Sequence, residues 1–184
     1  MSAQPSGRRD AQRNRRLLLD AALAAFTDEP DTISLEAIAR SAGVGIGTLY
    51  RHFPSREALI EAVYRNELER LCDEAGPLLD TRPPAEALRT WLGRYADFVA
   101  TKQGMAQALR EVIASGAVTS AGTRERLGAA IASILAAGGT AGTLRGDIRP
   151  EDVTAAMAGA TLAGTDRAQT DRLLDLLVDG VRAR

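Results

Sequence analysis

Apolar residues recur three and four positions apart along most of the chain, which is the period of one face of an α-helix. No segment has the strict apolar–polar alternation and β-branched enrichment that are typical of a strand. Alanine and leucine, both strong helix formers, occur throughout the sequence. The pattern therefore predicts an all-α protein.

Four helices are predicted in the N-terminal part of the chain. The first runs from about Asp10 to Phe26 and ends before an acidic, proline-containing loop at Asp28–Asp31. Ser34 stands where the N-cap of a second, short helix is expected. A third short helix is predicted over Ile46–His52, and Ser55 is expected to cap a fourth. The inner face of this fourth helix carries Ile60, Tyr64, Leu68 and Leu71.

Glycine and proline interrupt the helical pattern near Gly76–Pro84. We place the domain junction just before this stretch, on the fourth helix. The predicted domains are residues 1–56 and residues 57–184. Five further helices are expected in the second domain, over approximately Ala85–Gln103, Gly104–Ser115, Ala121–Ala141, Pro150–Ala163 and Thr165–Ala183.

The second and third helices, with the glycines between them, have the form of a helix-turn-helix. In this motif a short turn joins two helices, and the second helix can lie in the major groove of DNA. Gly43 can leave the second helix with a positive φ. Gly45 and Gly47 place no side chain between the start of the third helix and a duplex. The motif therefore predicts a DNA-binding domain.

The third helix has an inner face and an outer face. With 3.6 residues per turn, Leu49 and Phe53 point to the core and the remaining side chains point largely outward. Threonine and arginine can reach base edges or phosphates, isoleucine can touch a thymine methyl group, and serine, tyrosine and histidine suit phosphate. The predicted DNA-binding residues are Ser34, Gly45, Ile46, Gly47, Thr48, Tyr50, Arg51, His52 and Arg56.

The N-terminal third of the chain resembles the TetR-type (tetracycline-repressor-like) transcriptional regulators. The resemblance rests on Leu18-Leu-Asp-Ala-Ala22, Phe26, Ser34-Leu-Glu-Ala-Ile-Ala39, Ala42-Gly-Val44, Gly47-Thr-Leu-Tyr-Arg-His-Phe53 and Ser55-Arg-Glu-Ala-Leu59. It implies a three-helix DNA-binding domain, a helical C-terminal domain for an effector, and a homodimer that usually represses transcription until the effector binds. Members commonly have serine in place of Gly45, lysine in place of Arg56, and a glycine soon after Phe26. This chain departs from the family at all three positions.

The net charge of −1 indicates no global basic field, but the charge is unevenly distributed. Five arginines crowd the start of the chain, opposed there only by Asp10. They are Arg8, Arg9, Arg13, Arg15 and Arg16. This basic arm is equally consistent with contacts to DNA and with a solvated, solubilising tail. The sequence leaves the choice open.

The remaining composition argues against several classes of protein. No apolar run approaches the roughly 20 residues of a membrane span, and none has the form of a signal peptide, so a cytoplasmic protein is expected. A lone cysteine, Cys72, and a lone histidine, His52, provide neither a disulfide nor a cluster of metal ligands. No nucleophile–base pair is apparent. We expect no cofactor, no metal and no catalysis.

Two groups of residues in the second domain are candidates for further roles. An aromatic stripe is either plain core or the wall of a pocket for an apolar or weakly polar effector. The pocket candidates are Trp91, Tyr95, Phe98, Met105, Leu109, Met157 and Thr161. Small residues at four-residue steps, followed by a leucine-rich segment, suit either a four-helix dimer interface or intramolecular packing. The interface candidates are Ala155, Gly159, Ala163, Leu173, Leu177 and Val181.

The sequence therefore predicts a homodimeric repressor of a palindromic DNA operator, released by a small-molecule effector. Two alternatives remain. A helical carrier or enzyme would use the N-terminal helices only for packing, and would show no salt-dependent preference among duplexes. A second alternative keeps DNA binding but has no effector.

Overall fold

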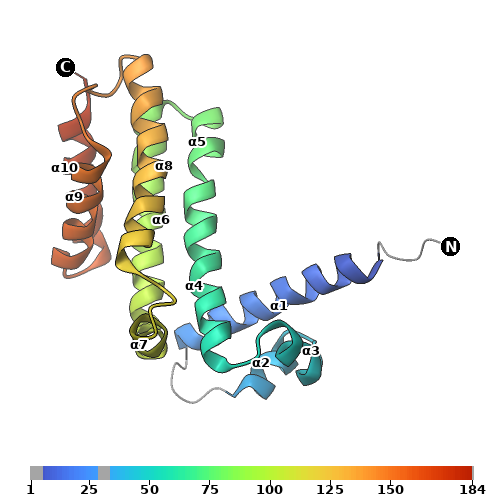
Figure 1. Cartoon of the computed structure of the whole chain (residues 1–184). Helices are drawn as coiled ribbons and strands as arrows, with labels where there is room; N and C mark the ends of the chain where they lie inside the picture. Colours follow the sequence, from blue (N-terminus) through green and yellow to red (C-terminus); the bar gives the residue numbers. More distant parts are fainter. Residues whose placement is uncertain (1–5, 29–33, 184) are drawn as a thin grey trace. The chain divides into compact units, whose positions relative to one another are not determined.

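The computed structural model describes residues 6–28 and 34–183 (Figure 1). In these residues the only pairing of extended backbone is an isolated bridge between Leu144 and Arg182, and the regular structure is helical. The predicted all-α fold is confirmed. The side chain of Arg8 and residues 29–31 of the expected acidic loop lie outside the described part of the chain.

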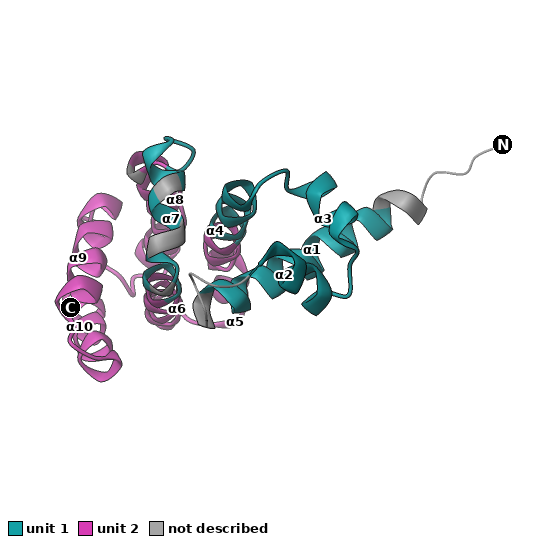
Figure 2. Cartoon of the chain, turned by 90° about the horizontal axis from the view of Figure 1, so that it is seen from below, with its two compact units in different colours: residues 1–66, 101–118 teal, residues 67–100, 119–184 magenta. Residues whose placement is uncertain are grey.

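The helices form two compact units, which are coloured separately in Figure 2. In chain order the helices are α1 (Ser6–Asp28), α2 (Leu35–Ser41), α3 (Ile46–His52), α4 (Arg56–Asp73), α5 (Ala75–Thr81), α6 (Pro84–Gly104), α7 (Ala106–Ala114), α8 (Ser120–Thr140), α9 (Pro150–Ala163) and α10 (Arg167–Val181). The first unit holds the described residues up to Asn66 together with Thr101–Val118, and the second unit holds the rest. The domain boundary that we expected after residue 56 stays a prediction.

In the first unit, α1, α2 and α3 pack on one another. Their shared core contains Leu18, Ala22, Phe26, Ile38, Leu49 and Phe53, all buried. The Ala37 N–H donates to Ser34 Oγ at 3.1 Å, so Ser34 is the N-cap of α2 as predicted. Gly43 has a φ of +65°, a conformation that glycine adopts without strain. This turn brings the Val44 N–H back to the Ala39 carbonyl at 2.9 Å and directs the chain into α3.

In the second unit, α5 occupies a stretch where we expected glycine and proline to interrupt the helical pattern. Its proline, Pro77, is the third residue of the helix. The N–H groups at such positions have no partner within the helix, so proline loses no hydrogen bond there. Pro84 similarly opens α6. Pro77 and Pro84, which suggested an interruption of the helical pattern, therefore lie in the first turns of two helices.

The core of the second unit is built around Trp91 of α6. Its indole is fully buried, and its Nε1 donates to the Leu71 carbonyl of α4 at 2.8 Å. Around this core α8 packs against both α5 and α9, and α9 packs against α10. At the end of α8, a Cβ on Gly138 would lie 2.4 Å from Leu144 Cδ1. Glycine there weakens the helix but leaves room for the buried Leu144 side chain.

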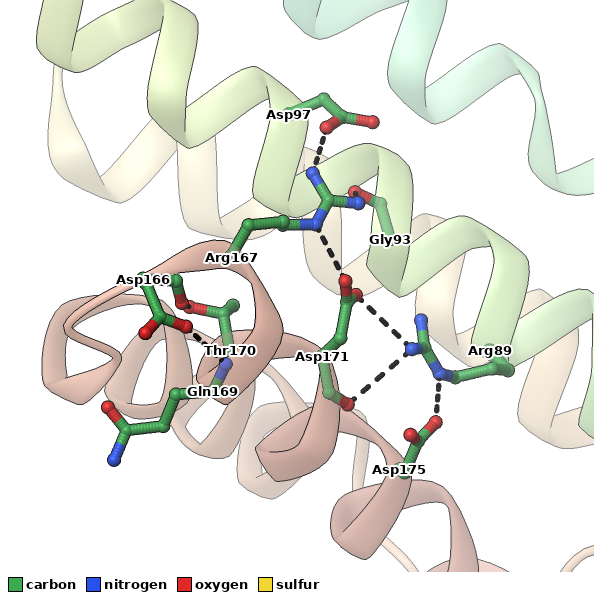
Figure 3. A network of polar contacts seen from close by, with 9 residues as sticks. All are labelled: Arg89, Gly93, Asp97, Asp166, Arg167, Gln169, Thr170, Asp171 and Asp175. Atoms are coloured by element: carbon green, nitrogen blue, oxygen red, sulfur yellow. Dashed lines mark hydrogen bonds and ion pairs between the residues drawn. The ribbon is translucent and has the colours of Figure 1, made fainter.

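A network of ion pairs joins α6 to α10 (Figure 3). Arg89 of α6 pairs with Asp175 and, at 3.2 Å, with Asp171 of α10. Arg167 of α10 pairs with Asp171 at 3.0 Å and with Asp97 of α6. Partial burial raises the pKa of the Asp171 carboxyl, but hydrogen bonds and charge from Arg167 and then Arg89 outweigh it, so this pKa lies below its usual value. An acid shared by two arginines therefore ties α10 to α6.

Candidate DNA-binding surface

The outer side of α3 carries exposed side chains over a buried one. Leu49 is fully buried in the core of the first unit, as predicted. Ile46 is 37% exposed, Tyr50 is 46% exposed, and Arg51 is also exposed. Thr48 and His52 are half-buried at the edges of this surface. The helix therefore presents an apolar, an aromatic and a cationic side chain together.

Two glycines leave the start of α3 without side chains. Gly45 is the N-cap residue of α3, in extended conformation and with no side chain to cap the helix. Gly47 is the second residue of the helix. A Cβ built on either glycine would meet no atom within 4 Å. Packing within the chain therefore does not require glycine at either position.

Ser34 and Arg56 lie at the starts of the two neighbouring helices. Ser34 is exposed, and because its Oγ accepts the Ala37 N–H, its own hydroxyl hydrogen can still be donated to a phosphate. Arg56 is half-buried, with its guanidinium carbon 5.0 Å from the centroid of the Phe26 ring. A cation–π contact of this kind holds the charge at the start of α4. That helix is capped by Ser55 Oγ, which accepts the Ala58 N–H at 3.2 Å.

Within residues 6–28 and 34–183, no group of three histidine, cysteine, aspartate or glutamate side chains is placed to hold a metal ion. No helix in that part of the chain is both long and apolar enough to cross a membrane. Burial raises the pKa of the Cys72 thiol, which disfavours the reactive thiolate.

The predicted pocket residues divide between the two units. In the second unit the rings of Trp91 and Tyr95 stack with centroids 6.4 Å apart, and Phe98 continues the stripe 6.5 Å beyond Tyr95. Met157 is buried in the same unit, while Thr161 is half-buried with its hydroxyl donated to the Met157 carbonyl at 3.1 Å. The remaining two candidates, Met105 and Leu109, are buried in the first unit. Their role in a pocket stays a prediction.

The predicted interface residues lie on α9 and α10. Ala155, Gly159 and Ala163 are exposed on α9. On α10, Leu173 and Leu177 are half-buried, and Val181 is buried within the protomer.

Two exposed leucines were not among the predicted interface residues. Leu162 of α9 is 85% exposed, and Leu176 of α10 is 68% exposed. Leu162 follows Ala155 by seven residues and Gly159 by three, so the helical period could have placed it with them. We refer to these exposed residues of α9 and α10, two helices that pack on each other, as the apolar surface of α9 and α10.

Two family models cover most of the chain. Residues 18–63 match the model for bacterial regulatory proteins of the tetR family, and residues 83–183 match the C-terminal domain of SbtR-like transcriptional regulators. The curated repressor LfrR of Mycolicibacterium smegmatis, an HTH-type transcriptional repressor, is 39% identical over 74 residues, or 36% of this chain. That match spans only 39% of the length of the relative.

Solved structures are similar over nearly the whole chain. The TetR transcriptional regulator SCO0520 from Streptomyces coelicolor is 50% identical, with a TM-score of 0.82 over 92% of this chain and 98% of its own. The TetR transcription regulatory protein from Mycobacterium vanbaalenii is 31% identical, with a TM-score of 0.77 over 96% of this chain and 99% of its own. The fold, the helix-turn-helix and these matches agree. The chain belongs to the TetR family of DNA-binding transcriptional regulators and is not an enzyme.

Proposed function

We propose that this regulator is a homodimeric, cytoplasmic repressor that places α3 of each protomer in the major groove of a palindromic operator, and that a small-molecule effector releases it. The observation that carries the proposal is the surface of α3, where Ile46, Tyr50 and Arg51 are exposed above the buried Leu49. A helix anchored on one side and exposed on the other can enter a groove without losing its core packing.

The DNA-facing residues divide into two roles. Thr48, Arg51 and Ile46 carry the sequence preference, since an arginine can pair with guanine and an isoleucine can contact a thymine methyl group. Ser34, Tyr50, His52 and Arg56 bind phosphates and fix the orientation of the protein on the duplex. Gly45 and Gly47 allow the backbone of α3 to approach the DNA closely.

The apolar surface of α9 and α10 is the proposed dimer interface. Large side chains as exposed as Leu162 and Leu176 favour association, because their burial removes apolar area from water. Ala155, Gly159 and Ala163 leave the surface of α9 smooth enough for a second helix to approach closely. On α10, Leu173 and Leu177 are half-buried and Val181 is buried, and we include them as further interface candidates. Two-fold symmetry in the protein then requires two-fold symmetry in the operator.

The effector is expected to bind in the helical C-terminal domain. The aromatic stripe of Trp91, Tyr95 and Phe98 is the leading candidate for a pocket wall, with Met157 and Thr161 as further candidates. An apolar or weakly polar ligand fits these side chains. To release DNA, the effector must bind more tightly to the state with the wrong spacing of the two recognition helices.

Selection of duplexes from a random DNA pool tests the proposal. The purified wild-type protein is compared with the variant Tyr50→Ala/Arg51→Ala, whose substitutions lie on exposed positions and leave the core intact. The proposal predicts enrichment of a palindrome by the wild type alone. If a folded wild-type dimer enriches no sequence, or if the variant enriches the same palindrome, α3 does not read DNA.

A further inference from the structure

The N-terminal half of α1 is not part of the core of the first unit. The buried side chains of α1 begin at Leu18. Every described side chain from Arg9 to Leu17 is exposed or half-buried. A polar stretch of helix gains little from tertiary packing, so its composition calls for another explanation.

This stretch concentrates positive charge, and Asp10 is the one acid among residues 9–17. Arg9, Arg13 and Arg16 are spaced four and three residues apart and therefore lie along one ridge of the helix. Within residues 6–28 and 34–183 neither they nor Arg15 form an ion pair, although several arginines elsewhere, such as Arg65, Arg89 and Arg167, do. Like charges at this spacing repel one another and destabilise an isolated helix. An anionic partner would remove that repulsion.

Arg15 is held beside the recognition helix. Its guanidinium carbon lies 5.4 Å from the centroid of the Phe53 ring, and Phe53 is the C-cap residue of α3. A guanidinium that stacks on a ring still has N–H groups at its edge, which can donate to a phosphate. Phe53 therefore positions a cation at the end of α3, next in the chain to His52 and Arg51.

We propose that α1 is a second DNA-contacting element of this regulator. Arg15 binds a phosphate at the edge of the groove that α3 occupies, and the ridge of Arg9, Arg13 and Arg16 binds the backbone of the flanking DNA. The inference rests on the proposed function in one respect, that α3 lies in the major groove. Of the two interpretations of the basic arm, it selects the contact to DNA over the solvated tail.

The test is the salt dependence of binding to a fluorescein-labelled duplex of random sequence, because phosphate contacts are independent of sequence. The variants are Arg15→Gln and the triple variant Arg9→Gln/Arg13→Gln/Arg16→Gln. The matched control is Arg82→Gln/Arg110→Gln/Arg124→Gln, which removes the same charge from three exposed arginines that form no ion pair among the described residues. The association constant is measured between about 50 and about 200 mM salt.

The slope of log K against log salt should become less steep by about 0.9 for each phosphate that a variant no longer neutralises. We expect a change of about 0.9 for Arg15→Gln and of up to about 2.7 for the triple variant, with no change in the control. Arg15→Lys should keep the slope, because it keeps the charge, but bind more weakly because lysine has no planar group to stack on Phe53. Circular dichroism should show undiminished helix content in every variant.

Two results would overturn the inference. An unchanged slope in both α1 variants would make the arm a solvated tail, and an equal change in the control would show a net-charge effect instead of a contact. In either case Tyr50→Ala/Arg51→Ala would still abolish enrichment of the palindrome, so the proposed function would stand. A wild-type protein without salt-dependent binding to any duplex would overturn both.

Discussion

Gly47 is a residue whose identity the protomer does not explain. It lies inside α3, where alanine would be the more stable choice, and a methyl group there would meet nothing within 4 Å. We predict that Gly47→Ala raises the free energy of unfolding by about 0.5–1 kcal/mol. It should also weaken DNA binding by about 1–3 kcal/mol, the usual cost of an overpacked contact. Chemical denaturation and a binding titration measure the two effects.

Gly128 of α8 is the matched control, since a Cβ there also meets nothing within 4 Å. Gly128→Ala should stabilise the protein without changing its affinity for DNA. If Gly47→Ala leaves the affinity unchanged as well, the backbone of α3 does not approach the duplex closely at this position.

Arg51 is the residue for which base and phosphate contacts are most easily distinguished. Replacing it with alanine should reduce binding to the selected palindrome by about 1–3 kcal/mol if it meets a base. Binding to a random duplex should then fall much less. Titrations of both duplexes at one salt concentration measure the difference. An equal loss on both would make Arg51 a phosphate contact.

At the scale of single elements, the sequence predicted those features that depend on neighbours along the chain. The bounds of α3, the caps at Ser34 and Ser55 and the turn at Gly43 all follow from local rules, and all are confirmed. The sequence missed α5, because Gly76 and Pro77 suggest a break unless the helix start is already known. It also missed the pairing of Arg89 with Asp175, 86 residues away, because such contacts depend on how helices pack.

The link between α6 and α10 should make stability depend on pH. We expect Asp171→Asn to lower the free energy of unfolding by about 0.5–1 kcal/mol at neutral pH, and by less in high salt. The pKa of Asp171 is lowered in the folded state, because Arg167 and Arg89 outweigh its partial burial. Its contribution is therefore present above about pH 4 and is lost as the pH falls through the folded-state pKa.

Denaturation of the wild type and of Asp171→Asn across this pH range tests the prediction. Asp179→Asn is the control on the same helix, since Asp179 pairs only with Arg182, three residues away, at 3.3 Å among the described residues. The control should have a smaller effect. A difference between Asp171→Asn and the wild type that persists at low pH would contradict an electrostatic link.

At the scale of the whole molecule, the proposed function requires dimerisation through α9 and α10. We predict that Leu162→Glu/Leu176→Glu makes the protein monomeric. Each protomer would then present two carboxylates to its partner, and these like charges would repel one another across the interface. The fold of the protomer should persist, since both side chains are already largely exposed. Light scattering after size-exclusion chromatography measures the mass. Ile113→Glu, at a position 45% exposed on α7, is the control and should remain dimeric.

The two halves of the molecule differ in how far the sequence predicts their function. The DNA-binding part is identified by residue types at fixed spacings, from Ser34 to Phe53, because a helix that enters a groove must satisfy the same geometry in every member. The C-terminal part carries no such motif. Its candidate interface was predicted from the spacing of small residues and leucines, and the structure adds Leu162 and Leu176 as exposed candidates.

The most direct test of the account is equilibrium binding to the selected palindrome and to the same duplex with one half-site scrambled. The wild type should bind the intact palindrome as a dimer and lose at least tenfold in affinity, about 1.4 kcal/mol, when one half-site is scrambled. Tyr50→Ala/Arg51→Ala should bind both duplexes weakly and without preference. Equal affinity of the wild type for the two duplexes would contradict a homodimer that reads DNA through α3 of both protomers.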